Sequence, residues 1–124
     1  MEDTKLPLEQ ARAFMAVLEQ LCRNPVAVDF HLPVATLFPE VDQEYSKVIE
    51  HPMDLSTVVS NLRNGRYKDS KRLIRHVHRI FLNCKKFNLK SNRIFYNRAD
   101  HLSDYFDSLL AERGLGGAGG GGGG

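Results

Sequence analysis

The strongest constraint on the fold is a long amphipathic pattern in the second half of the chain. Apolar side chains recur there at spacings of three, four and seven residues: Leu73, Ile74, Val77, Ile80, Phe81 and Cys84. Such a repeat places those side chains on one stripe of an α-helix, which must be buried against other elements. Asn88 follows Cys84 by four residues and continues the stripe. A polar amide at the end of an apolar face must find hydrogen-bond partners or cost about 1–3 kcal/mol, so Asn88 is a candidate binding residue.

Boundary signals predict two helices before this one. The first begins at Pro7 and stops before Pro25, because proline disfavours α-helical geometry in the residue before it. The second covers residues 55–64, where Asp54 is a good N-cap and Gly65 supplies the left-handed residue that commonly ends a helix.

The stripe itself and the residues after it predict a third and a fourth helix. The third covers about residues 71–87 and is capped by Ser70 or Asp69. Asn92 caps the fourth, whose apolar face consists of Phe95, Ala99, Leu102, Phe106 and Leu109 or Leu110. Four amphipathic helices without an alternating strand pattern predict an all-α fold, a helical bundle.

The connection between the first two helices is unusual for a bundle. It spans about thirty residues, from Asn24 to Met53, and only residues 44–49 could form a short helix. Structureless connections of this length are mostly functional or disordered. This one carries many apolar side chains: Val26, Val28, Phe30, Leu32, Val34, Leu37, Phe38, Val41, Tyr45, Val48 and Ile49. So much apolar surface must pack on the bundle, and an ordered connection near Asn88 predicts a pocket.

The composition is that of one small soluble domain. The chain has 124 residues, of which 42% are hydrophobic and 26% charged, and its net charge of +2 does not by itself demand a nucleic acid partner. It has no run of ~18 apolar residues to span a membrane, and its acidic start argues against a signal peptide. Cys22 and Cys84 fall in apolar helical patterns, which predicts two buried thiols and a reducing compartment.

Four motifs follow one another along the chain at specific spacings. They are Phe30-x-x-Pro33-Val34, Tyr45-x-x-Val48-Ile49-x-x-Pro52-Met53-Asp54-Leu55-Ser56-Thr57-Val58, Leu62-Arg63-Asn64-Gly65-x-Tyr67 and Phe81-x-Asn83-Cys84-x-x-Phe87-Asn88. Each is weak alone, but together they resemble a bromodomain, the acetyl-lysine-binding four-helix bundle. The resemblance covers about residues 8–112. It implies a left-handed bundle with a long ordered loop between helices 1 and 2 and a short loop between helices 3 and 4.

Two segments lie outside this resemblance. Residues 1–7 are predicted to be an N-terminal extension. Residues 113–124 form a Gly-rich tail, either a linker or a cloning remnant. Such a segment cannot bury enough apolar surface to offset its ordering entropy, so the tail is predicted to be disordered.

The resemblance implies a polar centre for the pocket and one apolar wall. Asn88 would donate its side-chain amide to the acetyl carbonyl oxygen. Tyr45 would hold a water that bridges to the same oxygen. Val34 and Phe30 would line the wall that takes the acetyl methyl group.

The resemblance also implies the rest of the lining. Phe87 and Cys84 would form the opposite wall, and Ile94, six residues after Asn88, would be the gatekeeper at the pocket rim. Of the first loop, Phe38 and Val41 are predicted to line the pocket. Which residues of that loop face the ligand stays open among four candidates: Leu37, Phe38, Pro39 and Val41.

The chain departs from the family pattern in places that bear on ligand preference. Val28 and Asp29 stand where a Trp-Pro pair is common, which reduces an apolar shelf. Phe87 stands where tyrosine is common, and Ser46 where a second aromatic is common.

A pocket of this kind would discriminate against unmodified lysine. Burying an unpaired ammonium group costs several kcal/mol, and the sequence predicts no carboxylate inside the pocket, with Glu40, Asp42 and Glu44 near its rim. Acetylation removes the charge and supplies an acceptor and a methyl group. One hydrogen bond of about 0.5–1.5 kcal/mol and about 0.8 kcal/mol per buried CH₂ predict a complex of micromolar or weaker affinity.

Several of these residues have plainer interpretations. Asn88 could serve only as a helix C-cap, Tyr45 could be a core tyrosine, and Ile94 could be the first core residue of the fourth helix. His76 and His78 look like a metal pair, but residues two apart on a helix point away from one another, so no metal is predicted.

An enzyme is not expected from this sequence. It has no Glu-x-x-His pair, no Gly-x-Ser-x-Gly elbow, no Gly-x-x-x-x-Gly-Lys loop and no His-Glu-x-x-His motif. No catalytic residue, cofactor or metal is therefore predicted.

The predicted partner is an acetylated histone tail or another acetylated nuclear protein, bound by a nuclear, monomeric domain. Basic residues of the third helix form either a solvated face or a weak, non-specific contact with DNA or a histone tail. They are Lys71, Arg72, Arg75, Arg79, Lys85 and Lys86. In the alternative function, the domain is a protein-binding or DNA-binding scaffold whose pocket no longer reads acetyl-lysine.

Overall fold

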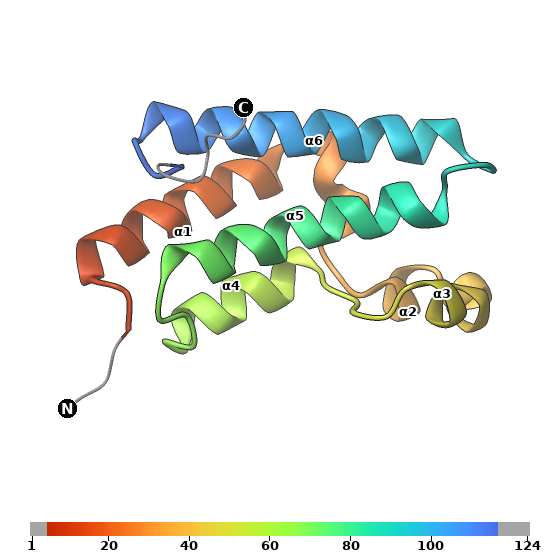
Figure 1. Ribbon diagram of the computed structural model, residues 1–124, viewed down its shortest axis with the longest axis horizontal. Coiled ribbons are helices and arrows are strands. Elements are labelled where there is room, and N and C mark those ends of the chain that lie inside the picture. The colour runs from red at the N-terminus through yellow and green to blue at the C-terminus, as the bar shows by residue number, and fades with distance from the viewer. Residues whose placement is uncertain (1–4, 117–124) are drawn as a thin grey trace.

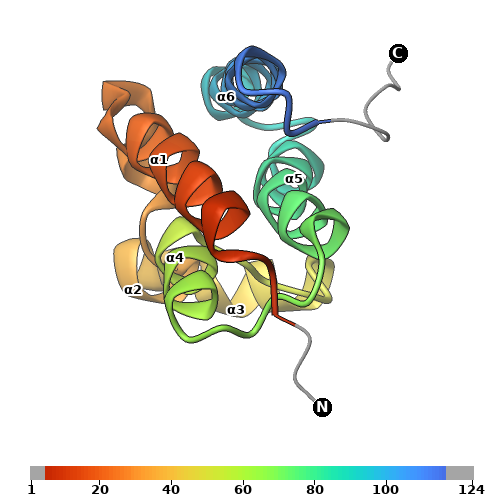
Figure 2. The same ribbon diagram turned by 90° about the vertical axis from the view of Figure 1, so that its left-hand side faces the viewer.

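Four long helices form a bundle (Figure 1). The computed structural model describes residues 5–116, in which the long helices are α1 (Leu8–Arg23), α4 (Leu55–Arg63), α5 (Ser70–Phe87) and α6 (Arg93–Glu112). α5 packs on α4 and α6, and α1 packs on the same two helices, so the four surround a common core (Figure 2). The described residues contain no strand, which confirms the predicted all-α bundle. No helix in this part of the chain is long and apolar enough to cross a membrane.

The long connection between α1 and α4 is built from four short helical elements. They are η1 (Pro25–Phe30), α2 (Val34–Leu37), η2 (Pro39–Val41) and α3 (Asp42–Val48). The first three begin with a proline or directly after one, because proline cannot continue a helix but fits its first turn. α3 matches the short helix predicted over residues 44–49 and starts two residues earlier. The others are too short to show a helical period in the sequence.

The predicted helix ends are largely confirmed. Side-chain oxygens of Asp54, Asp69 and Asn92 accept hydrogen bonds from backbone N–H groups at the starts of α4, α5 and α6, at 3.0, 3.0 and 3.2 Å. Of the two caps proposed for α5, Asp69 forms the bond and Ser70 is the first helical residue. Gly65 follows α4 with a φ of 68°, a conformation that favours glycine.

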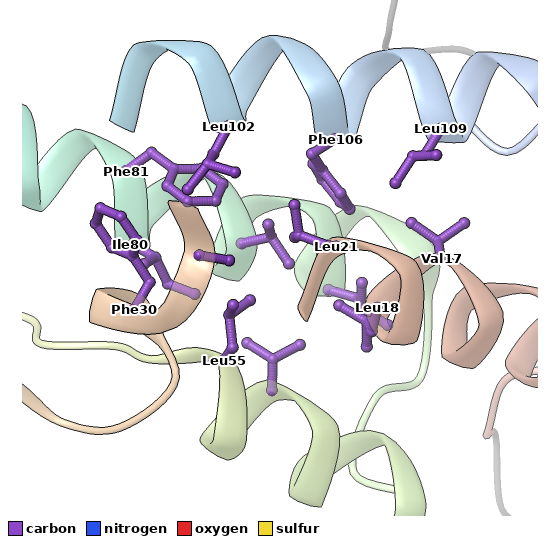
Figure 3. Packing of buried hydrophobic residues seen from close by; sticks show 14 of the residues in the cluster. Val17, Leu18, Leu21, Phe30, Leu55, Ile80, Phe81, Leu102, Phe106 and Leu109 are labelled. Atoms are coloured by element: carbon purple, nitrogen blue, oxygen red, sulfur yellow. The ribbon is translucent and has the colours of Figure 1, made fainter. Parts of the chain in front are cut away.

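One apolar core runs through the bundle, and the stripe on α5 is its centre. Leu73, Val77, Ile80, Phe81 and Cys84 are each at most 9% exposed. Figure 3 shows side chains of α1, α4, α6 and η1 meeting those of α5 around this stripe. Burial of these side chains, at about 1.5–3 kcal/mol each, is the main stabilising term of the fold.

The two histidines of α5 point to different elements, as predicted from their spacing. His76 is buried, and its Nδ1 lies 2.8 Å from the Tyr67 hydroxyl. Nε2 of His78 lies 2.9 Å from the Asp107 carboxylate of α6. Within residues 5–116 no cluster of three metal-ligating side chains exists.

The start of the Gly-rich tail is an ordered helix cap. Leu115 donates its N–H to the Leu110 carbonyl at 2.9 Å, and Gly114 donates to Ala111 at 3.1 Å. Gly114 has a φ of 67°, which completes a Schellman motif, and Leu115 packs on the core. Residues 113–116, assigned from the sequence to a disordered tail, are therefore ordered by this motif. The rest of the predicted tail, 117–124, and residues 1–4 lie outside the described residues.

Replacing Asp54 with alanine is expected to destabilise the domain more than the same change at Asp69. Asp54 is 5% exposed, and its carboxylate accepts from the Thr57 N–H and from the hydroxyls of Ser56 and Thr57. Asp54→Ala should lower the free energy of unfolding by about 2–3 kcal/mol, because three donors lose a buried acceptor. Asp69→Ala, which removes an exposed cap, should cost about 1 kcal/mol. Urea unfolding measures both, and equal losses would contradict the expectation.

Candidate functional site

A pocket of about 530 Å³ opens between the carboxyl end of α5 and the segment that joins α1 to α4. Its lining residues are Asp29, Phe30, Leu32, Val34, Phe38, Glu40, Val41, Glu44, Tyr45, Met53, Ile80, Cys84, Phe87, Asn88, Ser91, Asn92 and Phe95. The structure brings together eight of the nine residues proposed from the sequence, Ile94 being the exception.

Three hydrogen bonds hold the connection between α1 and α4, which forms one wall of the pocket, in place. The Asn83 amide of α5 donates to the His51 carbonyl at 2.9 Å, and the Ser56 N–H of α4 donates to the His31 carbonyl at 2.9 Å. Nε2 of His31 lies 3.0 Å from the Cys22 carbonyl of α1. The segment is thus tied to α1, α4 and α5, which explains how a chain without a long helix forms a defined wall.

Asn88 is at once the C-cap of α5 and part of the pocket lining. Its backbone N–H and its side-chain Nδ2 both donate to the Cys84 carbonyl, at 3.0 and 2.9 Å. This fixes the amide on the end of the helix. The only other acceptor near Nδ2 among the described residues is the Cys84 sulfur at 3.5 Å, a weak acceptor. One amide N–H therefore remains available for a stronger acceptor.

The Tyr45 hydroxyl is a second polar group of the pocket. Its side chain is 6% exposed, and its ring packs edge-on against Phe87 with 5.0 Å between centroids. No described residue hydrogen-bonds to the hydroxyl, yet none of the buried side-chain oxygens in that region is unsatisfied, so the hydroxyl faces the pocket space. Burial, with a smaller effect of Cys84, raises the pKa of Tyr45 to about 12. The hydroxyl is therefore a neutral donor at physiological pH.

Cys84 contributes an inert apolar wall. It is 9% exposed, and its Sγ lies 3.5 Å from the Phe95 carbonyl, to which the thiol donates. Burial raises the pKa of the Cys84 thiol to about 11, although the hydrogen bond with Asn88 lowers it. Cys22 and Cys84 are both free thiols, and Cys22 is half-buried rather than buried.

Phe95, and not Ile94, lines the mouth of the pocket. Ile94 is 64% exposed and is not among the lining residues. Phe95 begins the buried stripe that continues through Ala99 and Leu102, whereas Ile94 is rotated by about 100° around the helix. The Phe95 ring packs edge-on against Phe38 across the mouth, with 5.9 Å between centroids. The gatekeeper role of Ile94 stays a prediction, and the phase of α6 turns the next residue, Phe95, into the lining.

Three carboxylates line the pocket: Glu40 and Glu44, which were expected near its rim, and Asp29, which was not expected. Asp29 of η1 pairs with Arg98 of α6 at 3.2 Å, and this ion pair links the two sides of the mouth. Glu40 and Glu44 are exposed and form no ion pair with the described residues. Asp42, also expected near the rim, does not line the pocket. The mouth is therefore acidic.

Sequence reasoning missed several apolar and polar lining residues: Leu32, Met53, Ile80, Ser91, Asn92 and Phe95. Ile80 lies one helical turn before Cys84 on the same stripe, so the period of α5 could have identified it. Asn92 was identified only as a helix cap. For Leu32 and Met53 the sequence gives no signal, because their positions depend on how the first connection folds.

The structure is a four-helix bundle with a pocket at one end. A family model described as "Bromodomain" matches residues 14–101, and the chain belongs to the bromodomain family. Bromodomains are modules that occur in chromatin-associated proteins and bind acetyl-lysine, and the module itself is non-catalytic.

Curated relatives agree with this assignment. The chain is 34% identical over 112 residues to the E3 ubiquitin-protein ligase TRIM33 of Danio rerio, a match to 87% of this chain and 9% of that protein. It is 35% identical over 98 residues to the histone acetyltransferase GCN5 of Debaryomyces hansenii, covering 79% of this chain and 21% of the relative. Bromodomain-containing factor 1 of Candida albicans is 29% identical over 112 residues, 90% of this chain and 15% of the relative. The chain thus spans less than a quarter of the length of these relatives.

The Cys84 thiol is expected to react slowly at neutral pH, and its reaction rate should keep rising up to strongly alkaline pH. Because its pKa is about 11, the thiolate fraction should rise about tenfold per pH unit from pH 7 to pH 10. Alkylation by iodoacetamide, followed at each cysteine by peptide mass spectrometry, should modify half-buried Cys22 before Cys84. A Cys84 rate that levels off below pH ~9 would contradict this pKa.

Proposed function

We propose that this domain binds Nε-acetyl-lysine with the acetyl group beside Asn88. The observation that carries the proposal is the pair formed by the Asn88 amide and the Tyr45 hydroxyl in an otherwise largely apolar pocket. The available N–H of Asn88 donates to the acetyl carbonyl oxygen. The Tyr45 hydroxyl donates to a water that bridges to the same oxygen, and the methyl group contacts Val34 and Phe30.

The inner lining explains why a charged lysine would be rejected. An ammonium group beside Asn88 would meet only two neutral groups, the Asn88 amide and a Tyr45 hydroxyl that stays protonated. Neither can compensate the loss of hydration, which costs several kcal/mol. The exposed carboxylates of Glu40 and Glu44 lie on η2 and α3, where water screens them. The acetylated form has no charge to desolvate, so it is favoured.

The acidic mouth indicates what surrounds the acetyl-lysine in the partner. Glu40, Glu44 and Asp29 line the pocket, and only Asp29 has a cationic partner among the described residues. A ligand segment with lysine or arginine next to the acetyl-lysine would supply the missing charges. An acetylated histone tail, or another basic segment of a nuclear protein, has this chemistry. This implies that the domain acts in the nucleus.

Replacement of Asn88 with alanine is expected to lower the affinity for an acetylated histone-tail peptide at least about tenfold, because the acetyl oxygen loses its donor. Isothermal titration calorimetry with acetylated and unmodified peptides measures this loss. Asn97→Ala is the matched control, since Asn97 is an exposed asparagine of α6 outside the pocket lining.

Because Asn88 also caps α5, circular dichroism and thermal unfolding must accompany the titration. A folded Asn88→Ala variant that binds the acetylated peptide as tightly as the wild type would overturn the proposal. Binding that is equal for acetylated and unmodified peptides would instead favour a scaffold whose pocket does not read acetyl-lysine.

Removing the negative charge at the pocket mouth is expected to weaken the binding only of ligands that carry lysine or arginine next to the acetyl-lysine. Glu40→Gln with Glu44→Gln should reduce the affinity for an acetylated peptide rich in lysine and arginine by about 2–10-fold at low salt. Binding of N-acetyl-lysine methylamide, which has no charged neighbour, should stay unchanged. Glu19→Gln with Glu50→Gln, two exposed positions outside the pocket, is the control. Equal losses for both ligands would show that the carboxylates shape the pocket rather than select its partner.

A further inference from the structure

The charges of this chain are strongly separated along the sequence. Residues 55–99 contain twelve lysines and arginines and a single acidic residue, Asp69, whereas the rest of the chain has five basic and fourteen acidic residues. The twelve are Arg63, Arg66, Lys68, Lys71, Arg72, Arg75, Arg79, Lys85, Lys86, Lys90, Arg93 and Arg98. The small net charge of +2 conceals this separation.

The basic residues near the pocket end of α5 and on α6 are partly neutralised. Lys85 pairs with Asp100 at 2.7 Å, and Arg98 pairs with Asp29 at 3.2 Å. Lys85 also lies 5.2 Å from the centre of the Tyr96 ring, which attracts cations. Three exposed cations of this part of the surface, Lys86, Lys90 and Arg93, form no ion pair with a described residue, although Arg93 stacks over the Tyr96 ring at 4.3 Å.

The opposite end of α5 differs. Around the turn from α4 to α5 lie six exposed cations, here called the basic end: Arg63, Arg66, Lys68, Lys71, Arg72 and Arg75. None of the six forms an ion pair with another described residue. The one carboxylate between them, Asp69, is engaged in capping α5. This turn faces the viewer in Figure 2.

The environment of His76 reflects the same concentration of charge. Burial lowers the pKa of His76, and the nearby guanidinium groups of Arg72, Arg79 and Arg75 lower it further. These arginines thus act together on a group inside the bundle. The basic end is therefore a region of positive potential and not a set of isolated charges.

The side chains around these cations restrict the kind of anionic partner. The exposed large apolar residues of the described chain are Leu8, Val28, Leu32, Val48, Leu82, Leu89 and Ile94, none of which belongs to this turn. Insertion into a lipid surface needs such residues. Binding of single strands uses exposed aromatic rings, and the only aromatic residue here, Tyr67, is 2% exposed. What remains is a rigid surface rich in arginine, which suits phosphate groups at fixed spacing.

We propose that the basic end binds the phosphate backbone of double-stranded DNA without reading its sequence. The site is independent of the pocket, because Asn88 and the basic end lie at opposite ends of α5, about 27 Å apart for a helix of this length. The pocket stays open while DNA is bound. The inference goes beyond acetyl-lysine binding and does not depend on it.

Fluorescence anisotropy with a labelled duplex of random sequence tests the proposal. Neutralisation of about four phosphates should weaken wild-type binding about 100-fold between about 50 and about 200 mM salt. Arg72→Glu with Arg75→Glu should reduce the affinity at least about tenfold at low salt and flatten the salt dependence by about two phosphates. Both positions lie near the amino end of α5, where glutamate is compatible with the helix dipole.

Arg23→Glu with Lys47→Glu is the matched control, because it makes the same charge change at two exposed sites outside the basic end and the pocket lining. The control and Asn88→Ala should both keep DNA binding. Failure of the DNA-binding proposal is therefore distinguishable from failure of acetyl-lysine recognition. Equal losses in Arg72→Glu/Arg75→Glu and the control would overturn the proposal, as would no salt-dependent binding. Preference for a single-stranded oligonucleotide, an acidic peptide or anionic vesicles over the duplex would overturn it in favour of that partner.

Discussion

The pocket depends on the contact between η1 and the middle of α5. Phe30 is 6% exposed and packs edge-on against Phe81, with 5.5 Å between ring centroids. This aromatic pair places the first connection on the bundle, and the bond from Asn83 to the His51 carbonyl holds its far end. The wall that carries Tyr45 can then stand opposite Asn88. The wall is thus built by tertiary contacts, whereas the Asn88 side is built by one helix.

Local signals predicted most of the fold, and the residues on long helices were the easiest to place. The period of α5 predicts its buried stripe, and the sequence predicts the caps Asp54 and Asn92 and narrows the cap of α5 to Ser70 or Asp69. Residues whose position depends on helix phase or on distant contacts were harder to place. Ile94 was counted from Asn88, but the face that α6 buries begins at Phe95. Asp29 was recognised as a departure from the family pattern, and its place in the lining depends on how η1 packs.

The two ends of the molecule differ in charge, although the whole chain is almost neutral. The pocket mouth carries Asp29, Glu40 and Glu44, and the turn between α4 and α5 carries only one acidic residue among its cations. A separation of this kind orients a molecule in the field of a partner before contact. On the two proposals made above, a basic acetylated segment at the pocket mouth and DNA at the basic end would each meet a surface of opposite charge.

α5 is an uninterrupted helix of 18 residues, and this gives the domain the property of a fixed spacer. On the two proposals, DNA at one end and acetyl-lysine at the other would be held about 27 Å apart. A peptide tail must span that distance, which requires at least about eight extended residues between the DNA and the modified lysine. Acetylated lysines further along the tail would bind more tightly, because contact with DNA raises their effective local concentration at the pocket. Acetylated lysines nearer the DNA could not reach the pocket and would gain nothing. The length of one helix would then select which positions of a tail are read.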